Sequence, residues 1–225
     1  RLSLLTFYGR RAKRLLPAAS LVIVVTAVAA WLSAPVAQWR TIAGDLVGSS
    51  VYVVNWVFAG RAVDYLAEDV DPSPVLHYWS LAVEEQFYLI WPLVIIVLLW
   101  LGRRVLHDRH PSRRLLALGL TALVLAPSFV WALYLTGSDP ERAFFVTTTR
   151  LWELAVGALV ALGANRWRRL SARPAAVLAW VGLIAVVVGA LVQDGSTPWP
   201  GPGACVPVLG TAAVIVGGFA VGHPG

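Results

Sequence analysis

Six apolar runs, each about twenty residues long, alternate with short polar links in this sequence. A helix rises about 1.5 Å per residue, so about twenty residues cross the ~30 Å hydrocarbon core of a bilayer. Backbone groups in hydrocarbon have to pair within the protein. We therefore predict an all-α fold, a polytopic integral membrane helical bundle, with spans at about 15–33, 78–101, 115–136, 146–163, 175–193 and 204–222.

Composition excludes several other classes of protein. Hydrophobic residues make up 58% of the chain and charged residues 13%, against about 25% charged in soluble domains. The lone Cys205 excludes an internal disulfide and a cysteine metal cluster, and we predict no metal site. The basic residues stand in short clusters between apolar runs, which indicates contact with the lipid bilayer and not with nucleic acid.

These basic clusters also predict the topology. They lie at 1–14, 103–114 and 166–173, and the positive-inside rule places all three in the cytoplasm. The runs 15–33 and 78–101 must then cross in opposite directions. The intervening stretch 41–60 contains Asp45 and Asn55, so we expect it to be re-entrant or interfacial and buried in protein. A regular span is the alternative. We expect a multi-pass protein of the inner or plasma membrane.

An unusual group of polar residues enters the second long apolar run. His77, Ser80, Glu84 and Glu85 stand at its start, although ionisable groups cost roughly 2.5–3.5 kcal/mol each in a membrane segment. Paired carboxylates at such a cost indicate function. The alternative is a helix start with an interfacial aromatic belt and a solvated acidic end.

Helical spacing arranges these residues. We expect Ser73 to cap the helix and Pro74 to be its first residue. One face then carries a set of residues spaced by three or four: His77, Ser80, Glu84 and Tyr88. Glu85 lies about 100° further round, towards a neighbouring helix. Four glycines are expected at helix-packing positions, namely Gly157, Gly163, Gly182 and Gly189.

Three ordered motifs resemble a known family. HYWSLAVEEQFYLIWP at 77–92 resembles the hallmark segment of the acyltransferase-3 family of membrane-bound O-acyltransferases. FYGRRAKRLLP at 7–17 is similar to the basic motif that opens the family's third helix, and RLWELAVGA at 150–158 is similar to its later Arg/Glu segment. The resemblance covers nearly the whole chain.

The resemblance implies transfer of an acyl group, expected to be acetyl, from acyl-CoA to a hydroxyl of a cell-surface or exported carbohydrate in the bacterial cell envelope. Acyl-CoA is then a co-substrate, and no cofactor is bound. A lipid, antibiotic or peptidoglycan acceptor fits equally well. By the same resemblance the chain starts after the first two helices and stops before the last ones. The family's proposed catalytic histidine is on that first helix, so we expect this piece to be inactive alone.

Acyl transfer needs a base that accepts the hydroxyl proton, hydrogen-bond donors that stabilise the oxyanion, and groups that bind the acyl carrier. Histidine exchanges protons near neutral pH, and carboxylates can orient it. The candidate catalytic residues are His77, Glu84, Glu85, Arg150 and Glu153. We expect Arg150 to pair with Glu84 or Glu85, with Glu153 one turn along. A structural Arg–Glu network is the alternative.

Guanidinium groups bind phosphate bidentately, and this suggests a site for the acyl donor. The candidate substrate-binding or donor-binding residues are Arg10, Arg11, Arg14, Trp79, Ser80 and Tyr88. Simple positive-inside anchoring by the arginines is the alternative. At the level of function, a transporter or flippase of a lipid or glycan, with a polar midplane pathway, remains open, as does a non-catalytic scaffold.

Overall fold

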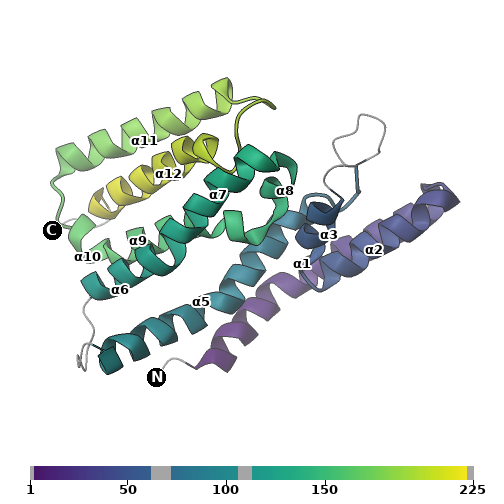
Figure 1. Cartoon of the computed structure of the whole chain (residues 1–225), viewed down its shortest axis with the longest axis horizontal. Helices are drawn as coiled ribbons and strands as arrows, with labels where there is room; N and C mark the ends of the chain where they lie inside the picture. The colour runs from purple at the N-terminus through teal and green to yellow at the C-terminus, as the bar shows by residue number, and fades with distance from the viewer. Residues whose placement is uncertain (1–2, 62–71, 106–112, 222–225) are drawn as a thin grey trace. The chain divides into compact units, whose positions relative to one another are not determined.

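The computed structural model describes residues 3–61, 72–105 and 113–221 (Figure 1). Helices are the only regular elements in these ranges, which confirms the all-α prediction. The chain divides into two compact units. The first unit contains Arg1–Pro92 and Phe145–Thr147, and the second contains Leu93–Phe144 and Thr148–Gly225.

Two long helices run antiparallel in the first unit. They are α1 (Leu4–Ser33) and α5 (Tyr78–Val105), of which the part up to Pro92 belongs to this unit. Tyr8 Oη donates to the carbonyl of Leu89 at 3.0 Å, and Tyr78 Oη donates to the carbonyl of Ala19 at 2.9 Å. The early part of α1 thus meets the later part of α5. This agrees with the opposite crossing directions expected from the basic clusters.

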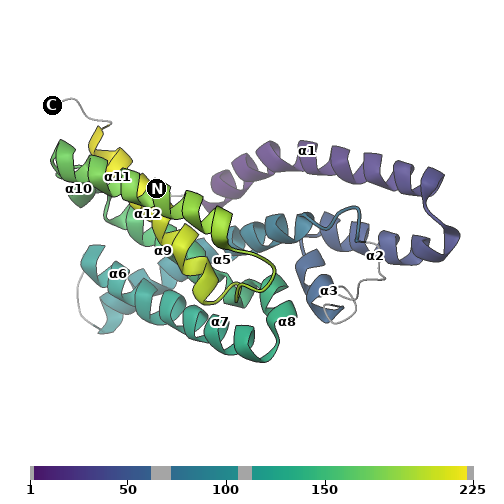
Figure 2. The same ribbon diagram turned by 90° about the horizontal axis from the view of Figure 1, so that it is seen from above.

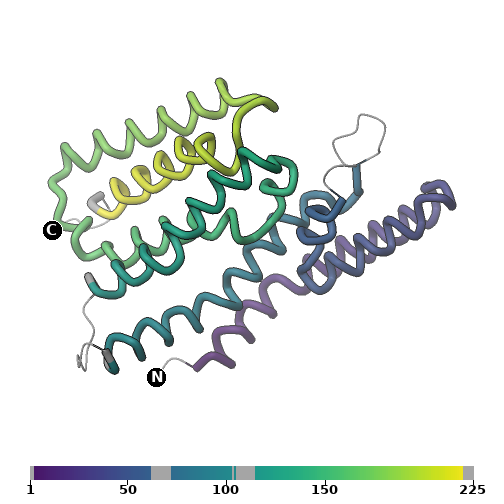
Figure 3. The backbone as a smooth tube through the Cα atoms, in the orientation of Figure 1, coloured from purple at the N-terminus to yellow at the C-terminus, as the bar shows by residue number. Residues whose placement is uncertain are grey.

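The stretch between α1 and α5 is a broken helix. After α1 the chain turns back, and α2 (Trp39–Ser50) lies beside α1 (Figure 3). A turn at Tyr52, whose φ is 56°, separates α2 from the short α3 (Val54–Gly60). At about 1.5 Å per residue neither helix crosses a bilayer. A single regular span over 41–60 is therefore excluded, while placement of the segment in the membrane stays a prediction.

The start of α5 differs from the prediction. Residues 74–77 form a turn, and the helix begins at Tyr78. The Ser73 hydroxyl accepts from the Val75 N–H at 3.4 Å, and the Ser73 carbonyl accepts from the Leu76 N–H at 2.9 Å. Ser73 thus caps a turn and not the helix, and His77 lies just before α5. The shared helical face expected for His77, Ser80, Glu84 and Tyr88 therefore begins only at Ser80.

The second unit is a set of helices linked by short turns. Its elements after α5 are α6 (Arg113–Leu120), a π turn (Thr121–Leu125), α7 (Ala126–Ser138), α8 (Pro140–Phe145, whose last residue belongs to the first unit), a 3₁₀ turn (Thr147–Thr149, whose first residue belongs to the first unit), α9 (Leu151–Leu162), α10 (Ala164–Trp167), α11 (Ala172–Val192) and α12 (Pro202–Val221). The π turn joins α6 to α7 as one rod (Figure 2). Pro127 lacks an N–H, and the preceding Ala126 N–H bonds five residues back to Thr121.

Helices α11 and α12 lie side by side, and glycines set their close approach (Figure 2). A Cβ on Gly182 would lie 2.5 Å from the carbonyl oxygen of Gly210, and one on Gly217 would lie 2.5 Å from that of Ala175. Gly182 and Gly189 thus occupy the packing positions expected from the sequence. Gly157 does not, because a Cβ there meets no atom within 4 Å, and Gly163 faces the ring of its own neighbour Trp167.

A polar turn links this helix pair. The Asp194 carboxylate accepts from the backbone N–H of Ser196 at 2.9 Å and from its hydroxyl at 2.6 Å. Together with a bond from Thr197, these contacts lower the pKa of Asp194. Gln193 donates to the carbonyl of Gly203 at 2.5 Å and closes the link.

Five helices are long and apolar enough to cross a membrane: Leu4–Ser33, Tyr78–Gly102, Leu115–Ser138, Ala172–Val192 and Pro202–Phe219. They overlap five of the six expected spans. The span expected at 146–163 is instead a 3₁₀ turn followed by the 12-residue α9. Residues 106–112 of the second basic cluster, Arg1 and residue 222 lie outside the described residues. Which ends face the cytoplasm stays a prediction.

The contact between α11 and α12 predicts that a glycine-to-alanine change destabilises the protein at Gly182 but not at Gly137. Gly182→Ala should lower the free energy of unfolding by about 1–3 kcal/mol, because its Cβ would push α11 away from α12. Gly137→Ala on α7 should be neutral or stabilising by up to about 1 kcal/mol, since its Cβ meets open space. Unfolding in detergent micelles measures both. Equal stability of the two variants would contradict the packing argument.

Candidate functional site

In the first unit, Glu85 of the hallmark segment binds Arg11 of the basic segment. Arg11 Nε donates to the two carboxylate oxygens of Glu85 at 2.9 and 3.0 Å, and Arg11 Nη2 donates to Oε1 at 2.5 Å. The guanidinium carbon lies 3.2 Å from the centroid of the Tyr88 ring, one turn along α5. Both partners are about one-fifth exposed. Glu85 therefore faces a neighbouring helix, as predicted, and two motifs 74 residues apart meet there.

This pair changes the expected role of Arg11. The Glu85 carboxylate balances the charge of the Arg11 guanidinium, and the Tyr88 ring covers one of its faces, so Arg11 is less suited to bind a phosphate than an unpaired arginine. Arg10 and Arg14 are exposed on the same helix, and Arg10 Nε donates to the Thr6 carbonyl of the same helix at 3.3 Å. The structure therefore separates Arg11 from the two exposed arginines. Tyr88 contacts Arg11 and so forms one cluster with Arg11 and Glu85.

The next residue, Gln86, joins three segments of the first unit. Its Nε2 donates to the Tyr52 carbonyl at 2.7 Å and to Asn55 Oδ1 at 2.9 Å. Its Oε1 accepts from the Thr147 hydroxyl at 2.5 Å and from Trp56 Nε1 at 3.1 Å. All four hydrogen-bonding positions of the amide are thus used. Gln86 fixes the irregular backbone between α2 and α3.

Asn55 completes this polar network. It is fully buried, and its Nδ2 donates to Thr147 Oγ1 at 2.9 Å and to the Phe145 carbonyl at 3.2 Å. On the other side of the broken helix, the buried Asp45 pairs with Arg61. Asp45 and Asn55 are therefore both buried in protein with partners, as the sequence suggested.

Several candidate residues of the hallmark segment are exposed. His77, Ser80 and Glu84 are exposed, and the Ser80 hydroxyl donates to the His77 carbonyl at 3.1 Å. Trp79 is half-buried, with its ring edge-on to Phe145 at 5.8 Å. The structure thus brings Glu85 and Tyr88 into one cluster and leaves Glu84 and His77 outside it. Their catalytic roles stay predictions.

The second unit contains the other charged pair. Arg150 is 6% exposed, and its Nη1 donates to Glu153 Oε1 at 3.0 Å, across one turn at the start of α9. Its Nε and Nη2 each lie 3.3 Å from the Phe144 carbonyl. The guanidinium carbon lies 5.6 Å from the centroid of the Trp199 ring. Arg150 thus pairs with Glu153 of its own unit. The expected pairing of Arg150 with Glu84 or Glu85 would join the two units and stays a prediction.

The start of α9 is held in place by α7. Ser128 Oγ accepts from the Trp152 N–H at 3.0 Å and donates to the Thr148 carbonyl at 2.6 Å. Thr149 Oγ1 donates to the Ala143 carbonyl at 2.7 Å. These bonds satisfy backbone groups that a helix end leaves open. They fix the turn that places Arg150 and Glu153.

Sequence reasoning missed the roles of Gln86, Thr147 and Trp199. Gln86 stands inside the hallmark segment, and Thr147 stands in a run of three threonines before Arg150. A polar residue within an apolar run was the available signal for both. Trp199 lies in the link between α11 and α12, and its neighbours in the sequence gave no indication of its place beside Arg150.

A double-mutant cycle tests the Arg11–Glu85 pair. Glu85→Leu alone should lower the free energy of unfolding by about 1–3 kcal/mol, because it leaves a half-buried guanidinium unpaired. The double variant Arg11→Leu/Glu85→Leu should lose less than the sum of the single variants. Glu84→Leu is the matched control and should change stability by about 0.5 kcal/mol or less. Additive effects in detergent unfolding would show that the pair does not stabilise the fold.

Gln86→Leu tests the amide network. It leaves the Asn55 amide oxygen and the Tyr52 carbonyl without their donor, at about 1–3 kcal/mol for each buried unsatisfied group. Trp56→Phe removes one bond at an exposed position and should cost about 0.5–1.5 kcal/mol. Thermal unfolding in micelles compares them, and an equal loss in both variants would refute the special position of Gln86.

Comparisons with known proteins agree with this arrangement of motifs. The family model described as "Acyltransferase domain", acyltransferase-3, matches residues 1–223. YrhL of Bacillus subtilis (strain 168), provisionally named a peptidoglycan O-acetyltransferase, is 38% identical over 158 residues, which cover 69% of this chain and 23% of that protein. The peptidoglycan O-acetyltransferase OatA of Listeria monocytogenes is 36% identical over 160 residues, covering 71% of this chain and 24% of that protein.

A third relative, the O-acetyltransferase OatA of Staphylococcus aureus (strain NCTC 8325), is 34% identical over 163 residues, covering 72% of this chain and 25% of that protein. The chain thus spans about a quarter of the length of the relatives it matches. No solved structure matches it significantly. With a family model matched over residues 1–223 and five helices able to cross a membrane, this chain is a multi-pass membrane protein of the acyltransferase-3 family.

Proposed function

We propose that this protein transfers an acyl group, acetyl, from acyl-CoA to a hydroxyl of a cell-surface or exported carbohydrate, with peptidoglycan as the first acceptor to test. The observation that carries this proposal is the acyltransferase match over residues 1–223. The names of the relatives, which refer to O-acetylation and to peptidoglycan, support the acetyl group and the acceptor.

The proposed reaction requires specific chemical groups from the protein. The acceptor oxygen attacks the thioester carbonyl, a C–O bond forms, the C–S bond breaks, and the hydroxyl proton passes through a base to the departing thiolate. A base and a cation near the developing oxyanion both lower the barrier. Arg150 and Glu153 supply a buried cation and a carboxylate in contact. Glu85 is less suited to a base role, because both its oxygens accept from Arg11.

The donor and the acceptor are proposed to approach from opposite sides of the plasma membrane. Acyl-CoA is made in the cytoplasm, where the positive-inside rule places the basic start of α1. Arg10 and Arg14 are exposed there and are the arginines proposed to contact its phosphates. The carbohydrate is outside, where the same topology places the start of α9.

Labelled acetyl-CoA tests this function. Membranes containing the intact protein should move label from acetyl-CoA into cell-surface glycan. His77→Ala and Glu84→Gln should each lower the label by about tenfold or more if these groups take part in proton transfer. Glu141→Gln, the same change on α8, is the control and should keep full activity.

The outcomes separate the proposals. Label that persists in both variants would make the hallmark segment structural while leaving the enzyme proposal intact. Wild-type membranes that incorporate no label, with the protein folded and inserted, would overturn the enzyme proposal. Loss of glycan export in Glu84→Gln with acylation unchanged would favour the transporter.

A further inference from the structure

The second unit contains a pocket beside the Arg150–Glu153 pair. Its volume is about 270 Å³, and it lies between α9 and the middle of α12. Glu153 and Gly157 of α9, Trp199 of the preceding link and Val208 of α12 are among its lining residues. We call it the Glu153 pocket. Small-molecule sites are typically about 300–1,000 Å³, so it has room for one small ring and not for a whole acyl-CoA.

The wall of this pocket is apolar apart from two side chains. Val156, Val208 and Ile215 supply aliphatic surface, while Glu153 and Thr211 supply oxygen atoms. Ligand sites commonly combine an apolar wall with a few placed polar groups that orient the ligand. The Glu153 pocket has this composition.

Glu153 has one carboxylate oxygen, Oε2, that can accept a hydrogen bond from a ligand. Its Oε1 accepts from Arg150 at 3.0 Å, and no described residue donates a hydrogen bond to Oε2. The side chain is 20% exposed, so little water reaches it. An acceptor in this position favours a donor from a ligand, because an unmet charge-assisted hydrogen bond is costly in an apolar setting. A neutral hydroxyl is a suitable donor, since Arg150 already balances the charge.

A glycine keeps the pocket open. Gly157 lies one turn after Glu153, and a Cβ at this position meets no atom within 4 Å. Gly182 of α11, by contrast, is required for helix contact, because its Cβ would lie 2.5 Å from a backbone oxygen. A glycine in the interior of a helix costs roughly 0.5–1 kcal/mol relative to alanine. Gly157 does not serve packing, so the space that it leaves is available to a ligand.

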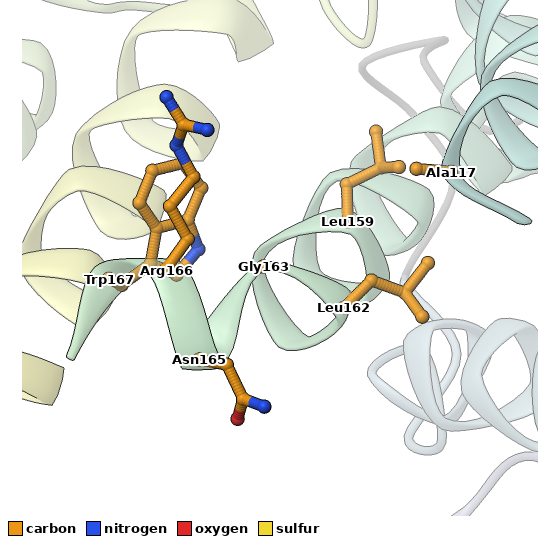
Figure 4. A pocket seen from close by; sticks show the side chains of 7 residues that line it. All are labelled: Ala117, Leu159, Leu162, Gly163, Asn165, Arg166 and Trp167. Atoms are coloured by element: carbon orange, nitrogen blue, oxygen red, sulfur yellow. The ribbon is translucent and has the colours of Figure 1, made fainter. Parts of the chain in front are cut away.

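A larger pocket in the same unit lacks this convergence. It has a volume of about 450 Å³ and is lined by residues around α10 and the end of α9 (Figure 4). Figure 4 shows Leu159 and Leu162 on the side of Ala117, whereas Arg166 and Asn165 extend away from that side. The polar side chains of this pocket therefore do not converge on one ligand position.

We propose that the Glu153 pocket binds the hydroxyl-bearing acceptor, with one sugar ring in the pocket and its hydroxyl donating to Glu153 Oε2. This inference rests on the proposed acyl transfer and adds the place where the acceptor binds. The ring places its carbon atoms against the apolar wall and its reactive oxygen beside the Arg150–Glu153 pair. Gly157 then sets how large a group the pocket accepts.

The test fills the pocket without touching the charged pair. Gly157→Leu puts a side chain into the open space, and Gly218→Leu on α12, also in open space but outside the pocket, is the matched control. Intact protein in lipid nanodiscs is assayed with acetyl-CoA and an N-acetylglucosamine tetrasaccharide. Calorimetry also measures binding of the tetrasaccharide without acetyl-CoA.

Gly157→Leu should raise the KM for the tetrasaccharide by about tenfold or more and leave the KM for acetyl-CoA within about twofold. Binding in calorimetry should weaken to the same degree. Gly218→Leu should change neither constant. Glu153→Gln should also weaken tetrasaccharide binding, because a neutral amide oxygen is the poorer acceptor. If Gly157→Leu does not fold, Gly157→Ala, which a helix tolerates well, supplies the smaller version of the same change.

Two results would overturn the inference, and a third would overturn the proposed reaction instead. An unchanged tetrasaccharide KM and affinity in Gly157→Leu would remove the acceptor from this pocket. A raised KM for acetyl-CoA with the tetrasaccharide constant unchanged would assign the pocket to the donor. In the third, wild-type protein binds the tetrasaccharide, with the binding weakened by Gly157→Leu and Glu153→Gln, and yet transfers no acetyl group. That result would contradict the proposed reaction and support the binding site.

Discussion

A polar side chain in an apolar helix has to find its partner within the protein, and two neighbouring residues of α5 show how much of the first unit depends on this. Glu85 binds Arg11 of α1, and Gln86 binds the turn at Tyr52, Asn55 of α3 and Thr147. Because successive residues of a helix point about 100° apart, one short segment reaches two different neighbours. The paired polar residues thus make α5 the centre of its unit.

The same constraint explains the broken helix between α1 and α5. Unpaired backbone groups cannot face lipid, so an irregular segment needs protein partners at membrane depth. Gln86 supplies one to the backbone carbonyl of Tyr52, and Arg61 pairs with the side chain of the buried Asp45. Asp45 and Asn55, the two polar residues singled out in 41–60, are therefore among the residues that hold it in place.

In the second unit, glycine serves two different purposes. At Gly182 it lets α11 and α12 come close, and at Gly157 it leaves space beside a carboxylate. Sequence reasoning assigned both glycines to helix packing, because spacing along a helix does not reveal what lies opposite. The geometry around Arg150 and Glu153, with Trp199 beside them, makes this unit the one in which we place the acceptor chemistry.

The sequence by itself determined the helical membrane class, the family motifs and the antiparallel direction of the first two long helices, because hydropathy, charge and helical period are local properties. It also predicted that Glu85 faces a neighbouring helix. Only the tertiary structure decided that the neighbour's residue is Arg11, that α5 begins at Tyr78 and that α9 is 12 residues long. These outcomes depend on which of several possible partners satisfies each polar group, and contacts between distant residues make that choice.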